Sequence, residues 1–301
     1  MKAIAYYLSL PFIYFFSFLP FPVLYVLSDI LVFPLLYYVT GYRRKVVFTN
    51  LQNSFPDKSE KELREIEKKF YRYLADLFME TVKFFTISES ELKRRYVFRN
   101  PEIADQWYEE GRNIVYTLGH YGNYEWMALA LDFAIKHRGK GPFREMSNPY
   151  FNQLFWRSRA RFGTELYPTY KTMEAIRKPS EEPYLVALAN DQSAPPDKSY
   201  WTTFLNQDTS FFVGTEKIAK TFNMPVLFAA ISRVKRGYYE INFEVITHHP
   251  KEEPEGDIME KHARFLENQI LNKPEYWLWS HRRWKHKKPE GLEKGFSLKK
   301  R

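Results

Sequence analysis

A histidine and a carboxylate stand five residues apart in the stretch Gly119-His120-Tyr121-Gly122-Asn123-Tyr124-Glu125-Trp126. An apolar, β-branched run that predicts a strand precedes this stretch, and a run that predicts a helix follows it. A histidine in such a turn suits a general base that takes a proton from a hydroxyl or an amine. A carboxylate that reaches the ring would fix its tautomer and stabilise the imidazolium. We therefore predict His120 as a general base and Glu125 as the acid that orients it.

Both residues also have plainer interpretations. An isolated histidine is more often a hydrogen-bonded loop residue, and a glutamate in the first turn of a helix complements the helix dipole. Residues five apart do not share a helix face, so contact between His120 and Glu125 requires the transition from loop to helix between them. Gly119 and Gly122 permit a tight backbone here, and the N–H groups that begin the following helix could hold an oxyanion. The chain contains no Cys, which excludes a thiol nucleophile, a disulfide framework and Cys-ligated zinc.

The elements that would position this turn follow from hydrophobic periodicity. Strands are predicted at 113–118 and 184–189, and a hairpin at 225–234 and 238–246 around Lys235-Arg236-Gly237. Helices are predicted at 57–86, capped by Asp57 or Ser59, and at 124–135, 149–162, 212–222 and 257–271. Strands that alternate with helices predict an α/β fold, and the hairpin predicts that its central sheet, flanked by helices, is mixed.

The N-terminus predicts a membrane anchor. Residues 3–28 carry no charge, and this run exceeds the roughly 20 residues that cross a bilayer as a helix. Its three prolines argue against one straight helix, so we expect a membrane helix over about 4–19, a break at 20–22 and a second helix near the interface. A cleaved signal peptide is disfavoured because the apolar region is too long and no small-residue cleavage site follows. A buried pair of apolar helices remains the alternative.

The basic residues Arg43, Arg44 and Lys45 follow directly and predict that the bulk of the protein faces the cytoplasm. We therefore divide the chain into an anchor with interfacial helices at 1–42 and a catalytic domain at 43–301. A length of 301 residues suits one large α/β domain, although two small ones would also fit.

Composition favours an anionic partner, because the formal net charge is +9 and aromatic residues make up 18% of the chain. Nucleic acid, acidic lipid headgroups and an acidic carrier protein all satisfy this charge. The membrane segment and the lack of an aromatic and basic recognition motif disfavour nucleic acid. The histidines at 248, 249, 262 and 286 fit no standard ligand spacing, so we predict no metal.

An ordered series of motifs resembles the bacterial lipid A late acyltransferases, the lauroyl and myristoyl transferases, within the wider His-x4-Asp/Glu glycerolipid acyltransferases. The resemblance covers about residues 18–286. A lone His-x4-Glu is a weak signal, whereas the whole series in order is specific. Its members are residues 43–51, 54–57, 119–125, Arg144 with Asn148-Pro149, 161–163, 190–192 and Pro274-Glu275-Tyr276-Trp277-Leu278-Trp279-Ser280-His281-Arg282-Arg283-Trp284-Lys285.

The resemblance implies an enzyme in the bacterial inner membrane with its catalytic domain facing the cytoplasm. It implies an acyl donor that is a thioester of acyl carrier protein or of coenzyme A, a membrane lipid acceptor, and no further cofactor. It makes His120 and Glu125 the catalytic pair. It assigns substrate binding to Asn123, Arg144, Arg161 and Asp191, with Arg144 suited to a phosphate and Asp191 either ordering the site or contacting the acceptor.

Further basic residues could dock an acidic carrier protein or an anionic membrane surface, although such runs are often only solvated. They are Arg157, Arg159, Arg161, Arg282, Arg283, Lys285, Lys287 and Lys288.

The segments 193–200 and 205–210 depart from the glycine-richer loops that are usual in this family, which leaves two acceptors open. One is a hydroxyl of a lipid A precursor, and the other is a different lipid, such as an aminolipid, a lysophospholipid or a glycolipid. A catalytically inactive scaffold of the same fold is disfavoured by the intact His120 and Glu125.

Overall fold

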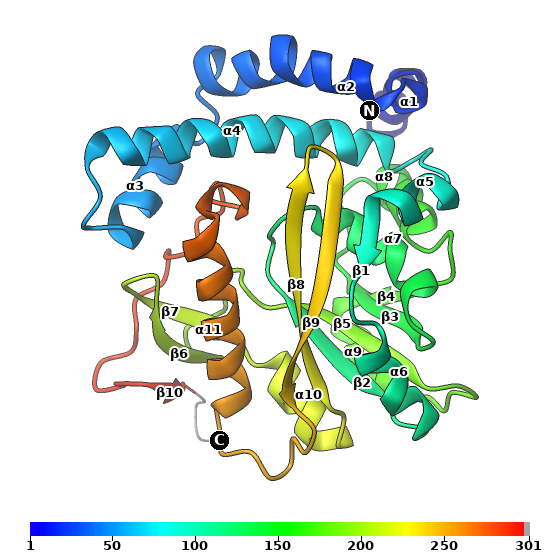
Figure 1. Cartoon of the computed structure of the whole chain (residues 1–301), viewed down its shortest axis with the longest axis vertical. Helices are drawn as coiled ribbons and strands as arrows, with labels where there is room; N and C mark the ends of the chain where they lie inside the picture. The colour runs from blue at the N-terminus through cyan, green and yellow to red at the C-terminus, as the bar shows by residue number, and fades with distance from the viewer. Residues whose placement is uncertain (298–301) are drawn as a thin grey trace.

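A mixed seven-stranded sheet lies at the centre of the protein, in the order β1-β9-β8-β2-β5-β3-β4 (Figure 1). The structure is a computed structural model and describes residues 1–297. β8 and β9 pair antiparallel, and the other neighbours pair parallel. The predicted mixed sheet, its strands and its hairpin are confirmed. The strands are β1 (Tyr96–Phe98), β2 (Ile114–Leu118), β3 (Arg138–Phe143), β4 (Glu165–Pro168), β5 (Tyr184–Ala189), β8 (Val226–Lys235) and β9 (Tyr238–Thr247).

Both faces of the sheet are buried, as a parallel sheet requires. All five residues of β2 are buried, and they alternate between two cores. Val115 packs with residues of α4, α10 and α11, whereas Ile114 and Tyr116 pack with residues of α5, α6 and α7. The helices that follow residue 43 are α3 (Arg44–Ser54), α4 (Glu60–Lys83), α5 (Glu89–Arg95), α6 (Glu102–Glu109), α7 (Tyr124–Ala134), α8 (Pro149–Arg159), α9 (Thr172–Arg177), which follows the short η3 (Thr169–Lys171), α10 (Gly214–Phe222) and α11 (Asp257–Asn272).

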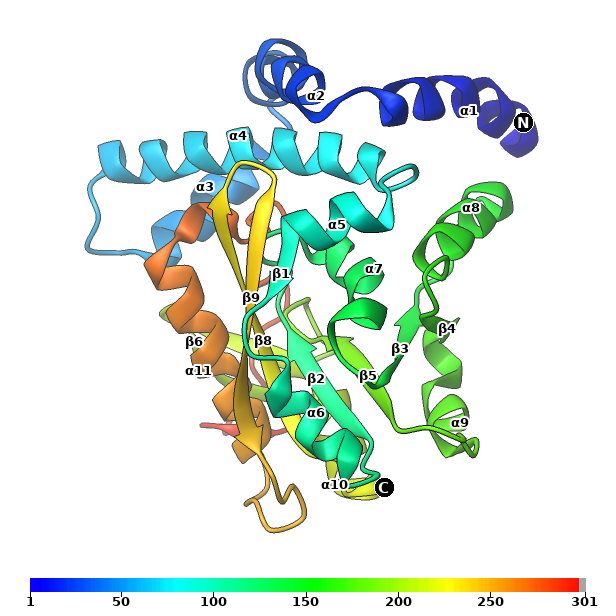
Figure 2. The same ribbon diagram turned by 45° about the vertical axis from the view of Figure 1, so that its right-hand side comes forward.

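Helix α4 separates the sheet from an N-terminal helical layer (Figures 1 and 2). Its start is fixed by a capping box in which Ser59 and Glu62 bond to each other's main-chain N–H, as the sequence predicts for Ser59. The layer above it holds α1 (Lys2–Phe18) and a helical run at Phe21–Val39. That run begins as α2 (Phe21–Leu27) and continues through the π-helical turns η1 (Ser28–Val32) and η2 (Leu35–Val39).

A second, three-stranded sheet covers the side of the domain near α11. It pairs β6 (Ser199–Phe204) with β7 (Gln207–Phe212) and β10 (Gly295–Phe296). Leu205 and Asn206 make the turn with φ of 50° and 61°, which matches the twist of a two-residue hairpin. The C-terminal segment that follows α11 and the short η4 (Pro274–Tyr276) runs past this sheet.

Candidate active site

The carboxyl ends of three neighbouring parallel strands meet at one edge of the central sheet. Strands β2 and β5 pair in register, with Leu118 opposite Ala189, and β3 lies beyond β5. His120 and Asp191 each follow their strand by two residues, and Arg144 directly follows β3. Ligands bind at the carboxyl ends of strands in open α/β sheets, so this edge is the expected position of an active site.

Asp191 holds His120 through two hydrogen bonds and is itself held by a third, from Trp277. The ring Nδ1 of His120 lies 2.6 Å from Oδ1 of Asp191, and the main-chain N–H of His120 donates to Oδ2 at 2.7 Å. The indole N–H of Trp277 donates to the same Oδ2 at 2.8 Å. The Asp191 carboxylate therefore accepts the Nδ1 proton, which leaves Nε2 of His120 as the basic nitrogen.

The free side of the ring faces Gln192, whose side-chain amide lies 3.1 Å from Nε2 of His120. The His120 side chain is 18% exposed, whereas that of Asp191 is 2% exposed. A substrate group can thus reach the ring but not the carboxylate behind it. This is the arrangement of a base with an orienting acid.

The turn that carries His120 is fixed by its surroundings. A Cβ on Gly119 would lie 2.4 Å from Leu266, so the close approach of α11 requires glycine there. Gly122 has φ of 57°, and its carbonyl accepts the Tyr73 hydroxyl at 2.6 Å. The C-terminal segment runs beside the turn, because the N–H of Leu278 donates to the carbonyl of His120 at 3.1 Å.

Charge and burial shift the pKa values of His120 and Asp191 in opposite directions. Burial by itself lowers the pKa of His120, but the charge and hydrogen bond of Asp191, with the charge of Glu125, outweigh it and raise that pKa. Burial raises the pKa of Asp191, but the charge and hydrogen bonds of His120 and the Trp277 N–H hold it well below its usual range. Asp191 is therefore ionised at neutral pH.

Glu125 does not contact the imidazole. Its Oε2 lies 2.6 Å from a guanidinium nitrogen of Arg159 on α8, and both side chains are about one-fifth exposed. The predicted contact between Glu125 and His120 is therefore replaced by one between Asp191 and His120. The reason is geometric, since Glu125 sits in the first turn of α7, on a different element from the His120 ring.

Two further residues that we expected to bind substrate have structural contacts instead. Asn123 is fully buried, caps α7 by accepting from Trp126, and donates to Glu80 at 2.6 Å. The guanidinium of Arg161 donates to the carbonyls of Phe85 and Ile87 just beyond α4. Their side chains are therefore occupied in holding α4 against α7 and α8. Arg144 is exposed at the sheet edge, and its substrate role stays a prediction.

Other titratable groups lie behind the pair. Burial lowers the pKa of His262 to about 4, and burial, with the nearby charge of Arg283, lowers that of His281 to about 4, although Asp191 opposes both shifts. His262 is fully buried, and Nε2 of His281 accepts the N–H of Ser193 at 3.2 Å. His262 is thus closed to substrate by burial, and the Nε2 of the partly exposed His281 is already bonded to the main chain, whereas the Nε2 of His120 faces only the Gln192 amide. Candidate metal sites of three or more ligands are absent from the part of the chain that the structure describes.

Arg283, which we expected on a docking surface, is buried instead. It is 1% exposed, and its guanidinium lies 4.7 Å from the centre of the Phe211 ring. Burial lowers its pKa to about 9, although the nearby Asp191 raises it. Its neighbours Arg282 and Lys285 remain exposed. The basic C-terminal segment is therefore divided between an interior cation and surface cations.

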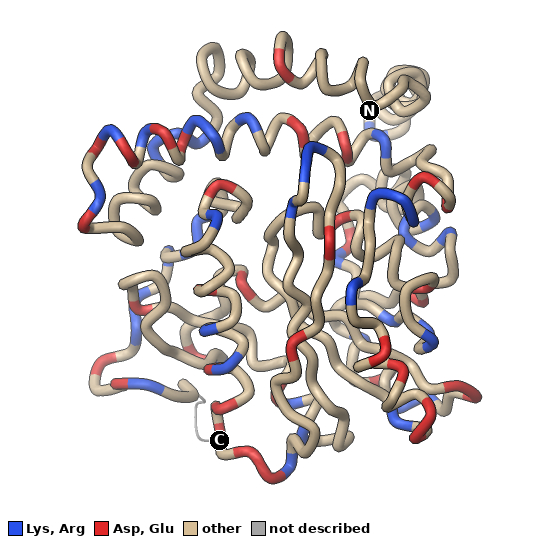
Figure 3. The backbone as a smooth tube through the Cα atoms, in the orientation of Figure 1, with Lys and Arg blue, Asp and Glu red and all other residues tan. Residues whose placement is uncertain are grey.

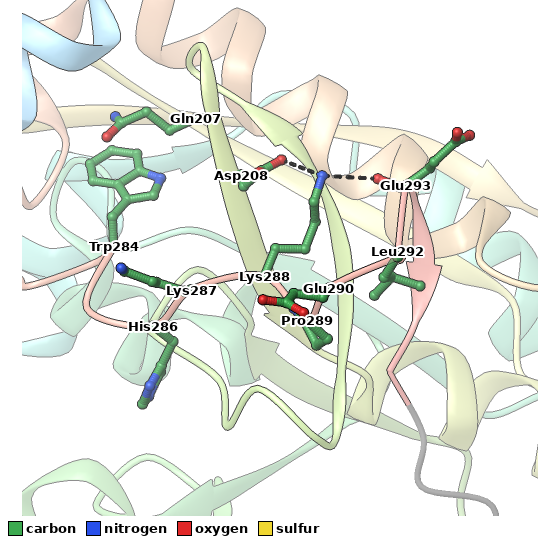
Figure 4. A pocket seen from close by; sticks show the side chains of 11 residues that line it. Gln207, Asp208, Trp284, His286, Lys287, Lys288, Pro289, Glu290, Leu292 and Glu293 are labelled. Atoms are coloured by element: carbon green, nitrogen blue, oxygen red, sulfur yellow. Dashed lines mark hydrogen bonds and ion pairs between the residues drawn. The ribbon is translucent and has the colours of Figure 1, made fainter.

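Two grooves border this segment. One, of about 340 Å³, is lined by Lys45, Arg282 and Lys285 with amide and hydroxyl side chains, and has no carboxylate in its lining. The other, of about 770 Å³, is lined by Gln207, Asp208 and residues 284–293 except Lys285, and Lys288 bonds Asp208 there (Figure 4). Neither is lined by His120 or Asp191. The first is joined to the site through Asn50, which donates to the carbonyls of Trp279 and His281.

Motifs that are far apart in the sequence thus converge on one site. Comparison with known proteins agrees with the family resemblance that these motifs carry. Residues 1–286 match the family described as bacterial lipid A biosynthesis acyltransferase. The chain belongs to this family. It is 26% identical to the lipid A biosynthesis lauroyltransferase of Escherichia coli K12 over 282 residues, 91% of this chain and 89% of that protein. It is 24% identical to a lipid A biosynthesis acyltransferase of Haemophilus influenzae over 241 residues, 77% of this chain and 72% of that protein.

Membership makes the protein an acyltransferase, with an acyl donor and a lipid acceptor of the lipid A type as substrates. The predicted enzyme class is confirmed. Gln192 and Trp277 lie within the motifs that carry the family resemblance, but we predicted no role for them. The equal offset of His120 and Asp191 from the ends of two predicted strands was the available signal for their pairing.

Proposed function

We propose that the protein transfers a fatty acyl chain from an acyl thioester to a hydroxyl of a lipid A precursor, with His120 as general base. The observation that carries this proposal is the partly exposed imidazole of His120, whose side chain is 18% exposed while its Nδ1 is held by Asp191. A base held in one tautomer can accept a proton at Nε2 only. Asp191 takes the orienting role that we first assigned to Glu125.

The reaction then balances as an acyl transfer. The acceptor oxygen attacks the thioester carbonyl carbon while its proton passes to Nε2 of His120. The tetrahedral oxyanion collapses, the carbon–sulfur bond breaks, and the imidazolium returns the proton to the thiolate. We assign the oxyanion to the main-chain N–H groups of Tyr124 and Glu125, which begin α7 at the positive end of the helix dipole; the N–H of Trp126 already donates to the Asn123 cap.

Glu125 and Arg159 form a second element of the proposed site. Glu125 is close enough for its charge to raise the pKa of His120, and it holds the Arg159 guanidinium in place. A guanidinium beside the reacting centre suits a developing negative charge or a phosphate of either substrate. Glu125 therefore acts as a positioning residue for Arg159 in this scheme.

The donor is an acyl carrier protein or coenzyme A thioester, and both present the phosphate of a pantetheine arm. The groove of Lys45, Arg282 and Lys285 suits that phosphate because three cations converge without a lining carboxylate. The double variant Arg282→Gln, Lys285→Gln should raise KM for the donor with little change in kcat. Lys251→Gln, which removes a cation from an exposed loop outside both grooves, is the matched control. An unchanged donor KM would remove the groove from the scheme.

We place the protein at the bacterial inner membrane with the catalytic domain facing the cytoplasm. The family of lipid A biosynthesis acyltransferases and the apolar N-terminal layer support this location. The cations Arg43, Arg44 and Lys45 beside that layer suit the anionic lipids of the cytoplasmic leaflet. Mass spectrometry of lipids from a deletion strain tests the function as a whole. Wild type should restore one acyl chain to lipid A, and His120→Ala should not. Loss of a chain from another lipid class, with lipid A intact, would contradict the acceptor and favour the aminolipid, lysophospholipid or glycolipid alternative.

A further inference from the structure

We propose that α1 and the helical run Phe21–Val39 lie flat in one leaflet of the membrane and that neither crosses it. The run has 19 residues and is the one helix in residues 1–297 that is long and apolar enough to cross a bilayer. Its contacts with the catalytic domain are incompatible with crossing. The inference concerns the mode of membrane binding and does not depend on the acceptor or on the catalytic residues.

The middle of the run is bonded to the catalytic domain. Asp29 pairs with Arg236 through two contacts of 2.8 Å, and Ser28 donates to Asp76 of α4 at 2.7 Å. Arg236 lies in the turn between β8 and β9 and also bonds Asp76. If the run crossed, Asp29 would lie near the bilayer centre and would take the hairpin and α4 with it. Each such charge costs about 3 kcal/mol at that depth by insertion scales.

Residues of the run on either side of Ser28 and Asp29 are also bonded to the catalytic domain. The hydroxyl of Tyr25 donates to Glu80 of α4 at 2.9 Å, and that of Tyr37 accepts from Arg44 of α3 at 3.2 Å. The inward stripe of the run, which includes Leu24, is buried against the domain. The run therefore packs on α4, above which it lies in Figure 1. An element bound along its length to a water-soluble surface has no segment left to enter the bilayer core.

Helix α1 is fastened to the catalytic domain at both ends. At its start, Lys2 donates to the carbonyl of Ser147 at 2.7 Å. At its end, the hydroxyls of Ser17 and Thr86 lie 2.7 Å apart, and Lys83 donates to the carbonyl of Ser17 at 2.9 Å. A helix of 17 residues is about 25 Å long. With both ends on one domain, α1 spans the surface of that domain.

The outward faces of both helices are apolar and exposed. In the uncharged part of the layer, tan in Figure 3, the outward side chains follow helical spacing. They are Ile4, Tyr7, Leu8, Phe12, Phe15 and Phe18 on α1, each 62–71% exposed, and Val23, Val26, Ile30, Leu31, Leu35, Tyr38 and Val39 on the run, each 42–75% exposed. A face of this extent needs a partner, and its mixture of aromatic and branched aliphatic residues suits the headgroup and acyl boundary of a leaflet.

The layer is joined to the catalytic turn through one residue. Glu80 accepts from Tyr25 through Oε1 and from Asn123 through Oε2, at 2.9 Å and 2.6 Å. A flat layer would therefore hold the turn before α7 close to the membrane surface. On the proposed function, this is where a lipid acceptor would present its hydroxyl.

Depth measurements test the flat arrangement directly. The chain has no native Cys, so a label on a single-cysteine variant of the full chain attaches at one position only. Val23→Cys, Ile30→Cys and Tyr38→Cys place spin labels at the two ends and the middle of the outward face. In phosphatidylethanolamine and phosphatidylglycerol vesicles, all three should report the same depth, about 5–10 Å below the headgroups. A crossing helix would instead place Ile30 about 15 Å deep and the other two at opposite surfaces, which would overturn the proposal.

Sidedness gives a second readout. Pro20→Cys precedes the run, Thr40→Cys follows it, and Lys251→Cys marks the catalytic domain; all three positions are exposed. In sealed spheroplasts and inverted vesicles, an impermeant maleimide should label all three from the same side. Labelling of Pro20→Cys and Thr40→Cys from opposite sides would show that the run crosses.

Discussion

The substitution Asp191→Asn tests which of two carboxylates, that of Asp191 or that of Glu125, orients the His120 ring. The Asp191 carboxylate accepts from the Nδ1 of His120, from its main-chain N–H and from Trp277. An asparagine keeps the shape, but its amide can donate to Nδ1, which favours the tautomer with the proton on Nε2. That tautomer cannot accept the proton of the acceptor hydroxyl. General-base catalysis contributes about 10²–10⁴ in rate, so we expect kcat to fall by that factor.

The pH dependence supplies a readout that simple damage to the fold would not give. The base works when neutral, so the rate rises as pH rises through the pKa of His120. Asp191 raises that pKa and burial lowers it, so removing the carboxylate charge should move the rising limb to lower pH while the plateau falls. The assay is the initial rate of acyl transfer in vesicles from about pH 5 to pH 9, a window around the ordinary histidine pKa.

Glu125→Gln is the matched comparison, because it also neutralises a carboxylate near the ring. Its charge contributes to the raised pKa of His120 without a hydrogen bond, so the limb should move less than in Asp191→Asn. The loss of activity in Glu125→Gln should come from an unpaired Arg159. An unmoved limb in Asp191→Asn, with a large shift in Glu125→Gln, would refute the reasoning and restore the pair first predicted from the sequence.

Three further substitutions test the supports of the site. Trp277→Phe removes an N–H bond to the ionised Asp191, worth about 1.5–3 kcal/mol, and should lower kcat about tenfold or more while moving the pH limb slightly up; a wild-type rate would contradict this. Asn50→Ala frees two carbonyls of the C-terminal segment and should lower the unfolding free energy by about 1–3 kcal/mol in a denaturant titration. Glu80→Gln should cost about as much, because three donors converge on that buried carboxylate, and an unchanged midpoint would deny it a role in holding Asn123.

Regular apolar runs made much of the fold predictable. Strands β2 and β5 and the hairpin of β8 and β9 are β-branched or alternating, and the boundaries of α4, α7 and α11 agree with prediction within a few residues. The missed elements lack these signals. Strand β3 reads Arg-Gly-Lys-Gly-Pro-Phe and exists because β4 and β5 pair with it. The hairpin of β6 and β7 turns at Leu205-Asn206, which is not a usual turn pair.

The candidate site was predictable in its base but not in the partner of that base. His120 was identified from its motif, and the nearest carboxylate in the sequence, Glu125, was taken as its acid. The acid that contacts the ring lies 71 residues away and is brought there by the register of two parallel strands. Asn123 and Arg161 belong to the same motifs but are occupied with capping and with main-chain carbonyls. A motif thus identified the region, whereas the contacts divided its residues between chemistry and support.

The most direct test of the central claim is the mass of the acceptor after reaction with the purified full-length protein. Vesicles containing a lipid A precursor and an acyl thioester should yield, with wild type, a product heavier by the mass of one fatty acid minus one water. His120→Ala, matched to wild type by its thermal unfolding and vesicle binding, should form this product at least about 10²-fold more slowly. A His120→Ala rate within about twofold of wild type would contradict the account, because a general base contributes far more than that.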